Sequence, residues 1–594
     1  MSDAPKRCPR LPRAFLPALG LSLVPAVAVA ARGLWRTSSG ELRLSLFDDA
    51  MISMSYARTF AEGHGLVWYP GAPRVEGFTN LSWTLLMALL HRVGLGSNAI
   101  AAAIMALGVA CVWLAAVVVL RLARQFGLDP ADRRATFFTA AVVTLNFPLL
   151  YWAVRGMEVG LVTLLMLLAT LAAWKLHDAR STRASIALAV VVALGVITRT
   201  DFVVVAAGIG LWVATNREAR RWRVVAPLAV GSSAALVVTT AFRLWYYDRP
   251  FPNTYYLKLE GVPLSDRLGR GLTVDLVNAG AWLLPSVVLI ALGWRSLGGR
   301  QRRFAALLGS LAAVHVAYST YAGGDAWEHF VFPNRYLTPG VVCLSVLAVL
   351  VIFATADAPA SSIPADRREG ALLLVAAGPL LTALVSRLTS LRATGHPAWL
   401  VLPAVAVLLL GGAGWARARR GGADRPATMY GRASLLCILL LGTMVFRAPK
   451  LLEGDGNVYS QLGERITHVS SPDATVAVTG AGGVQYFSRR AAVDLFGKND
   501  RVVAEAPPSW EVFLPGHDKW NLEHSLGDLR PDLLLHPAVP GLEPGYLDEL
   551  GYVKVQPVAS SGGWLPGDRP DAVGYALGGS EHVRWDLLAR TPET

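Results

Sequence analysis

Long apolar segments are the feature that most limits what this chain can fold into. Of its 594 residues, 53% are hydrophobic and only 16% are charged, whereas soluble domains are about a quarter charged. The apolar residues gather in runs of about 15 to 24 residues, the length at which a helix crosses roughly 30 Å of hydrocarbon. The sequence therefore predicts a polytopic α-helical membrane protein with about thirteen spans, at 14–31, 98–120, 134–152, 157–175, 184–198, 201–214, 222–245, 275–294, 304–321, 336–356, 369–388, 398–416 and 432–447.

Three of the apolar segments differ from ordinary spans. Segment 14–31 follows a basic tail but is long for a cleaved signal peptide, so we expect a retained anchor helix. The pair 184–198 and 201–214 reaches only about 21 Å per helix, which predicts a thin or broken hairpin. Segment 77–93 is short and ends in His91-Arg92, and we expect an amphipathic or re-entrant helix on the outer side.

The basic residues indicate how the chain is oriented. Lysine and arginine are concentrated in the loops on the N-terminal side, and cytoplasmic loops carry this excess. We therefore predict a plasma-membrane protein with a cytoplasmic N-terminus and, after an odd number of spans, an extracytoplasmic tail. The same flanking residues account for the net charge of +13 without a nucleic-acid partner. The basic loops are 1–13, 121–134, 175–183, 217–223, 295–303, 357–368 and 417–432.

The composition divides the chain into a membrane domain, 1–448, and a soluble extracytoplasmic domain, 449–594. In the soluble domain, 475–479 and 491–495 are typical of strands, and 484–488 is typical of a helix. A glycine turn precedes that helix but lacks the full spacing of a dinucleotide-binding loop. The order strand, turn, helix, strand predicts an α/β fold. The sequence has no internal repeat, which argues mildly against a transporter.

Two adjacent carboxylates, Asp48 and Asp49, lie in the long loop after the first span. Two neighbouring acids in a partly dry site separate in pKa, because they cannot ionise equally easily. One of them would then act as a base on an acceptor hydroxyl, and the other would orient a sugar or hold a cation. The structural alternative is helix capping, which is common for aspartate. A divalent metal held by the pair with a substrate phosphate is a further alternative that we do not favour, and we expect no cofactor.

Further polar and aromatic segments follow the acidic pair along the outer loops. Together they resemble the GT-C glycosyltransferases, and most of all the terminal arabinofuranosyltransferases of mycobacterial arabinan synthesis and their uncharacterised relatives. One departure is Arg155, which stands where this family would have serine or threonine before the glycine. The segments that carry the resemblance are Asp48-Asp49, Tyr56-Ala-Arg58, Gly63-His-Gly65, Val75-Glu-Gly-Phe-Thr-Asn80, Trp83, Trp152, Gly156-Met-Glu158, Arg199-Thr-Asp201, Pro252-Asn-Thr-Tyr-Tyr-Leu-Lys258, Gly323-Gly-Asp325, Arg335, Pro339, Asp494-Leu-Phe-Gly497 and Pro515-Gly-His-Asp-Lys519.

The resemblance implies a polyprenyl-phosphate sugar donor, a glycan acceptor outside the membrane, and an outer-loop aspartate as catalytic base. An anionic leaving phosphate needs fixed cations, for which Lys258, Arg335 and Arg199 are candidates. Interfacial anchoring is the alternative for Lys258, and a mutual ion pair is the alternative for Arg199 and Asp201. The predicted substrate-binding residues are Arg58, His64, Glu76, Asn80, Glu158, Arg199, Asp201, Tyr256, Lys258, Asp325, Arg335, His517 and Lys519.

These observations predict an inverting membrane glycosyltransferase that acts on a cell-envelope glycan. The family resemblance indicates arabinofuranose as the sugar, with mannose, galactose and an aminosugar left open. One alternative is a transporter or flippase of lipid-linked sugars, which would need ionisable residues near the middle of its spans. A second alternative is an inactive scaffold whose tail binds a cell-wall partner, and this would make the outer-loop carboxylates dispensable.

Overall fold

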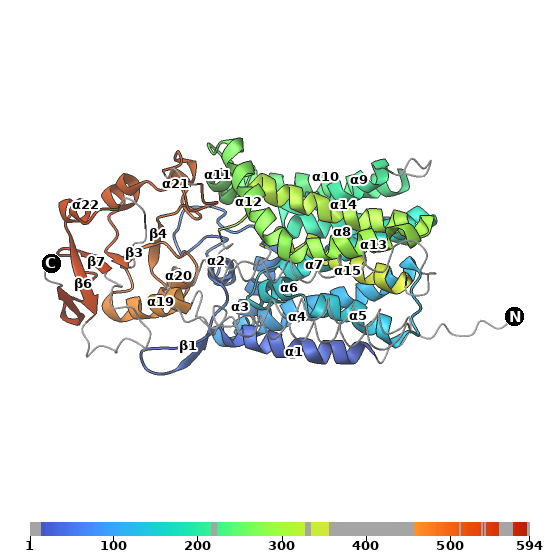
Figure 1. Cartoon of the computed structure of the whole chain (residues 1–594). Helices are drawn as coiled ribbons and strands as arrows, with labels where there is room; N and C mark the ends of the chain where they lie inside the picture. Colours follow the sequence, from blue (N-terminus) through green and yellow to red (C-terminus); the bar gives the residue numbers. More distant parts are fainter. Residues whose placement is uncertain are drawn as a thin grey trace.

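The computed structural model shows a bundle of helices with an α/β domain at one end (Figure 1). It describes residues 14–215, 222–326, 334–355, 457–509, 513–535, 539, 542–557 and 574–590. The expected spans 369–388, 398–416 and 432–447 lie outside the described residues. The helices of the bundle are α1 (Phe15–Ala31), α4 (Ser97–Phe126), α5 (Arg133–Thr144), α6 (Phe147–Val154), α7 (Val159–Asp178), α8 (Thr182–Thr198), α9 (Val203–Thr215), α10 (Trp222–Tyr247), α12 (Leu264–Trp282), α13 (Leu284–Gly293), α14 (Gly299–Ala322) and α15 (Thr338–Ala354).

The described helices fit a polytopic membrane protein. Among them, α4, α7, α10 and α14 are each long and apolar enough to cross a membrane, which makes four candidate spans. The bent pair α5 and α6 would make a fifth, and shorter apolar helices such as α1 and α8 accompany them. The expected spans that lie on described residues coincide with these helices or helix pairs. The total of about thirteen spans stays a prediction.

The expected span at 134–152 consists of two helices rather than one, because the chain bends by 50° between α5 and α6. Asn146 stands at the break, and its side-chain oxygen accepts a hydrogen bond from the backbone N–H of Leu149 at 3.2 Å. Pro148 lies in the first turn of α6, where its missing N–H costs no helical hydrogen bond. The apolar composition continues through this break, so a search for apolar runs does not detect it.

The boundaries expected for 275–294 also need correction. Helix α12 begins earlier, at Leu264, and a second helix, α13, follows with Pro285 in its first turn. Helix α12 is amphipathic, and its buried Asp275 accepts hydrogen bonds from the hydroxyls of Ser319 and Thr320, both at 2.8 Å. Polar residues lower the average hydropathy of 264–274, so this part of the helix does not stand out as an apolar run.

Short elements cover the end of the bundle that meets the α/β domain. They include the hairpin of β1 (Leu34–Arg36) and β2 (Leu42–Leu44), and the helices α2 (Asp48–Ala61), α3 (Leu81–Arg92) and α11 (Asn253–Leu259). The segment expected at 77–93 is indeed a short helix: α3 has 12 residues, and a helix that crosses a bilayer needs about 20.

The tail forms a six-stranded sheet in the order β4-β3-β5-β7-β6-β8. Strands β4, β3 and β5 are parallel, and the other pairs are antiparallel. The expected strand, turn, helix and strand are present as β3, α20 and β4, with bounds that differ by about one residue. The elements are α19 (Asn457–Val469), β3 (Thr475–Val478), α20 (Gly483–Ser488), β4 (Ala491–Asp494), α21 (Arg501–Glu505), β5 (Leu533–Leu535), α22 (Pro544–Glu549), β6 (Tyr552–Pro557), β7 (Gly574–Leu577) and β8 (Leu588–Arg590).

Candidate active site

A cavity of about 330 Å³ lies where the bundle meets the tail. Its volume is within the range of small-molecule sites. Side chains from α2, α11, α14 and the tail line it together with the segment that precedes α3. One part of the wall is apolar and aromatic, with Phe251 and Tyr255 stacked at a centroid distance of 4.5 Å. The ionisable residues on the wall are Asp49, Arg199, Asp201, Lys258, Arg335 and Lys498.

The chain is fixed in place immediately before the acidic pair. The backbone N–H of Phe47 donates to the carbonyl of Arg155 at 2.9 Å, and the fully buried Arg155 guanidinium donates to the Ser45 carbonyl at 3.4 Å. Helix α2 then begins at Asp48, with Phe47 in the capping position and no side-chain cap. The two carboxylates therefore do not cap this helix. Arg155, the residue that departs from the family pattern, instead holds the backbone segment that directly precedes the two carboxylates.

Asp49 faces the cavity and is held by two cations. Its oxygens lie 2.5 Å from the Lys498 ammonium and 2.7 Å from the Arg335 guanidinium. Burial would raise the pKa of this carboxyl, but Lys498 and Arg335, with Lys258 beyond them, hold the pKa well below its usual value. Asp49 is therefore ionised at neutral pH, the state that a general base requires.

Asp48 points to the other side of α2 and is absent from the cavity wall. Its two oxygens accept the backbone N–H groups of Gly483 at 2.7 Å and Gly482 at 3.3 Å. Burial raises the pKa of Asp48 to about 6 against the opposing effect of these amides and of Lys498. The two acids thus shift in opposite directions, as the sequence predicted, and Asp48 attaches the glycine turn of the tail to α2.

A second carboxylate, Asp325, anchors the cations behind Asp49. The Arg335 guanidinium donates to Asp325 at 2.6 Å, and the Lys258 ammonium lies 3.8 Å from the same carboxylate. Burial raises the pKa of Asp325, but Arg335 and Lys258 together lower it to about 2. Lys258 also donates to the Tyr336 hydroxyl at 3.2 Å. Two of the three predicted phosphate ligands, Arg335 and Lys258, therefore lie together on one wall of the cavity.

Arg199 and Asp201 lie at the break between α8 and α9. The Arg199 guanidinium pairs with Asp201 at 2.6 Å and also with the fully buried Glu158. Asn80 donates to the other Glu158 oxygen at 2.8 Å, and the Tyr318 hydroxyl donates to Asp201 at 3.2 Å. The ion-pair interpretation and the substrate-binding interpretation of Arg199 and Asp201 are compatible. The ion pair fixes the break between α8 and α9, and both of its members line the cavity.

Three predicted residues of the first outer loop lie away from the cavity wall. Arg58 is buried, donates to the Tyr486 carbonyl at 2.6 Å and lies over the ring of that tyrosine. Glu76 forms a buried ion pair with Arg243 at 2.7 Å. His64 is exposed in the turn after α2. Arg58 and Glu76 thus connect parts of the fold, and none of the three contacts the cavity.

The predicted residues near α11 and in the segment 515–519 also have structural contacts. The Lys519 ammonium donates to the backbone carbonyls of Tyr256, Glu260 and Ala504 at 2.8 to 3.0 Å. The His517 ring packs against Phe496, and burial lowers its pKa to about 4, so this imidazole is neutral. Neither side chain reaches the cavity wall, so the contacts of both are structural.

Sequence analysis missed Lys498, although it identified the motif Asp494-Leu-Phe-Gly497 directly before it. Lys498 comes from the tail and lies on the cavity wall beside Asp49. The available signal was a basic residue directly after the motif Asp494-Leu-Phe-Gly497. Tyr318 and Tyr336 were missed as well, because an aromatic residue at the end of a span is equally typical of an interfacial anchor.

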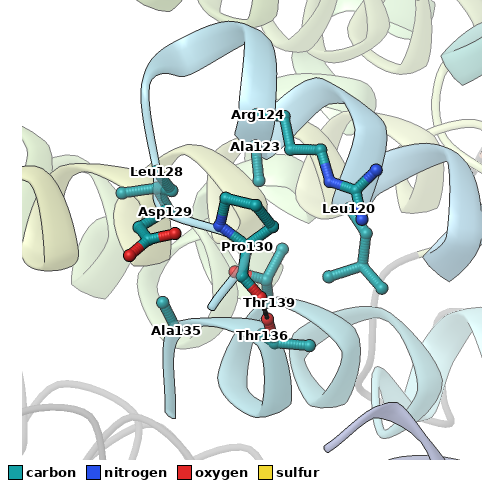
Figure 2. A pocket seen from close by; sticks show the side chains of 9 residues that line it. All are labelled: Leu120, Ala123, Arg124, Leu128, Asp129, Pro130, Ala135, Thr136 and Thr139. Atoms are coloured by element: carbon teal, nitrogen blue, oxygen red, sulfur yellow. Dashed lines mark hydrogen bonds between the residues drawn. The ribbon is translucent and has the colours of Figure 1, made fainter. Parts of the chain in front are cut away.

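A second, much smaller pocket lies between the end of α4 and the start of α5 (Figure 2). Figure 2 shows Arg124, Asp129 and Thr136 around Pro130. Its volume of about 10 Å³ corresponds to roughly one water molecule, so it does not hold a sugar or a phosphate. Across the described ranges, no group of three or more metal-binding side chains comes together.

Comparison with known proteins identifies the fold. Residues 451–570 match a domain of unknown function (DUF8728), and no curated protein sequence matches the chain. The crystal structure of ArnT from Cupriavidus metallidurans bound to undecaprenyl phosphate is 15% identical with a TM-score of 0.57, over 95% of this chain and 98% of ArnT. The apo structure of ArnT is 17% identical with a TM-score of 0.51, over 81% of this chain and 86% of ArnT.

These similarities show that the chain shares the fold of ArnT, since the match spans nearly the whole of both chains, and they fit the predicted polytopic membrane protein. The particular resemblance to mycobacterial arabinofuranosyltransferases stays a prediction.

Proposed function

We propose that this protein is a membrane glycosyltransferase that moves a sugar from a polyprenyl-phosphate donor to an extracytoplasmic glycan. One observation carries the proposal: an ionised carboxylate, Asp49, lies in a cavity beside Arg335, Lys258 and Lys498. A base for a hydroxyl and cations for a phosphate are the two groups that this reaction needs. The fold is shared with ArnT, whose crystal structure holds undecaprenyl phosphate.

In the proposed reaction Asp49 accepts the proton of an acceptor hydroxyl. The hydroxyl oxygen then forms a bond to the anomeric carbon of the donor, while the bond from that carbon to the phosphate oxygen breaks. The polyprenyl phosphate leaves with the electron pair, and the configuration at the anomeric carbon inverts. Arg335 and Lys258 stabilise the negative charge that develops on the leaving phosphate.

The structure favours Asp49 over Asp48 as the base. Asp49 lines the cavity, whereas both oxygens of Asp48 are occupied by backbone N–H groups of the tail. A base must lie within hydrogen-bonding distance of the proton that it removes. Its ion pairs with Arg335 and Lys498 hold Asp49 ionised, and an arriving phosphate would compete for the same cations.

The resemblance on the outer-loop motifs supports arabinofuranose as the transferred sugar and a cell-wall glycan as the acceptor. The cavity of about 330 Å³ has room for one sugar ring and a phosphate group. Mannose, galactose and an aminosugar are the alternatives for the sugar.

Deletion of the gene, followed by linkage analysis of the envelope glycans, tests this function. The deletion strain is complemented with the wild-type protein, with Asp49→Asn, or with Asp178→Asn, which changes an acid that pairs with Arg300 away from the cavity. We expect a terminal sugar to be lost and then restored by the wild type and by Asp178→Asn. Asp49→Asn should lower transfer at least about a hundredfold, because a general base contributes about that much.

Two results would contradict the proposal. The first is full restoration of the glycan by Asp49→Asn. The second is movement of a lipid-linked sugar across vesicles that contain the purified protein, without formation of a glycosidic bond, which would identify a flippase.

A further inference from the structure

One loop of the tail, residues 494–500, reaches into the cavity of the membrane domain. Its Lys498 side chain is 12% exposed, and its ammonium lies 2.5 Å from Asp49. Lys498 is therefore the one ionisable residue on the cavity wall, among the described residues, that belongs to the tail. The other ionisable residues on the wall come from the membrane domain.

Both domains hold this loop in place. Within the tail, the Asp494 carboxylate accepts the backbone N–H groups of Phe496, Gly497 and Asn499 at 2.9 to 3.1 Å. From the membrane domain, the Asn253 amide donates to the carbonyls of Gly497, Lys498 and Asp500 at 2.8 to 3.2 Å. The Tyr56 hydroxyl donates to the Asn499 side chain at 3.0 Å. These contacts fix the backbone on both sides of Lys498, so its ammonium is positioned before any substrate arrives.

The charges at the cavity show what Lys498 contributes. One ion-pair network joins the cations Lys258, Arg335 and Lys498 to the carboxylates Asp49 and Asp325. This network has one positive charge in excess with Lys498 and none without it. The neighbouring network of Arg199 has two carboxylates and provides no spare cation. An anionic headgroup would therefore meet an ion-pair network without positive excess if the tail did not supply Lys498.

We propose that the tail is part of the active site and binds the lipid phosphate directly through Lys498, together with Arg335 and Lys258. This inference rests on the proposed function and assigns a role to the domain matched at 451–570. When phosphate enters, the Lys498 ammonium exchanges part of its contact with Asp49 for a phosphate oxygen. Asp49 is then free to face the acceptor hydroxyl.

Binding of undecaprenyl phosphate to the purified full-length protein tests the inference without requiring transfer. The variants are Lys498→Met, Lys498→Arg and a matched control, Lys554→Met, which removes a tail lysine on β6 that does not line the cavity. We expect Lys498→Met to weaken binding about tenfold to a hundredfold, the range of one charge-assisted hydrogen bond. Lys498→Arg should keep most of the affinity, and Lys554→Met should keep all of it.

Binding of undecaprenol, which lacks the phosphate, distinguishes the contribution of the phosphate charge from that of the lipid chain. Its binding should be the same in the wild type and in Lys498→Met. Equal affinities of these two proteins for undecaprenyl phosphate would overturn the inference. An equal loss of affinity for undecaprenol would overturn it too, because the effect would then not depend on the phosphate.

A second comparison covers the case in which Lys498→Met does not fold because it leaves Asp49 short of a partner. Asp49→Asn and the double variant Asp49→Asn with Lys498→Met differ only in the lysine, and neither leaves that carboxylate buried. The double variant should again bind undecaprenyl phosphate more weakly, and equal binding would refute the inference. The two proposals can be refuted separately. If gene deletion leaves the glycan linkages unchanged but Lys498→Met binds undecaprenyl phosphate more weakly, the proposed reaction is refuted and the proposed phosphate site is not.

Discussion

At the scale of single residues, two adjacent aspartates have different environments because neighbouring positions on a helix point in different directions. Asp49 meets Lys498 and Arg335 at the cavity, and Asp48 meets the amides of Gly482 and Gly483. The sequence predicted that the pair would separate in pKa. It did not predict which of the two acids would have the raised pKa and which the lowered pKa, since three of these four partners lie more than 400 positions away in the chain.

The pKa of Asp48 leads to a prediction about stability. Burial raises it from its usual 3.8 to about 6, so the folded protein binds this proton at a higher pH than the unfolded chain does. The stabilising contribution is fully present below about pH 4 and is lost as the pH rises through about 6. Lowering the pH from 7.5 to 5.5 should therefore stabilise the wild type by about 1 kcal/mol relative to Asp48→Asn.

Thermal melting of the purified wild type and of Asp48→Asn at both pH values measures this difference. The comparison cancels the contributions of other titrating groups, which the two proteins share. A gap in melting temperature that does not change with pH would show that Asp48 titrates as an ordinary exposed acid.

At the scale of elements, the sequence predicted most helices and the break between α8 and α9, but not the break after α5 or the one between α12 and α13. Apolar composition locates a helix in lipid, whereas the bend after α5 depends on one capping residue, Asn146, within an apolar run. The early start of α12 was missed for the opposite reason, because its polar face packs against α14 and resembles a loop in composition. Two of the six strands of the tail, β3 and β4, were predicted, since flanking turns are local signals, whereas β5, β6, β7 and β8 were not.

The turn before α20 provides a test at this scale. A Cβ atom added at Gly482 would lie 1.9 Å from the backbone oxygen of Asp48, so Gly482→Ala must push the tail turn away from α2. Overpacking of this kind costs about 1 to 3 kcal/mol. We expect limited proteolysis to cleave the tail of this variant faster, and we expect transfer to fall because Lys498 moves with the turn.

Gly545→Ala is the matched control, because nothing lies within 4 Å of a Cβ atom at that position in α22. This variant should resemble the wild type in both assays. If Gly482→Ala is also as resistant to protease and as active as the wild type, the contact between α2 and the tail does not hold the tail in place.

At the scale of the whole molecule, the fold joins two domains at one site. The bundle supplies the acids and two of the cations that we propose to bind phosphate, and the tail supplies the third. Composition divides the chain near residue 449 but does not indicate that both domains contribute to one site. A boundary based on hydropathy contains no information about contacts between domains. The polytopic membrane fold was within reach of sequence reasoning, since long apolar runs are typical of membrane-spanning helices.

The central claim is that this cavity opens outside the cell and binds a lipid phosphate, and labelling of Tyr255→Cys tests it most directly. Tyr255 lines the cavity and is 39% exposed. Arg180→Cys, in the loop between α7 and α8, serves as the control for the opposite side. Both variants are made after the four native cysteines have been replaced.

We predict that a membrane-impermeant maleimide labels position 255 but not position 180 in intact cells, and that undecaprenyl phosphate protects position 255 in the purified protein. Labelling of position 255 only after the cells are permeabilised, or no protection by a saturating concentration of the lipid phosphate, would contradict the account.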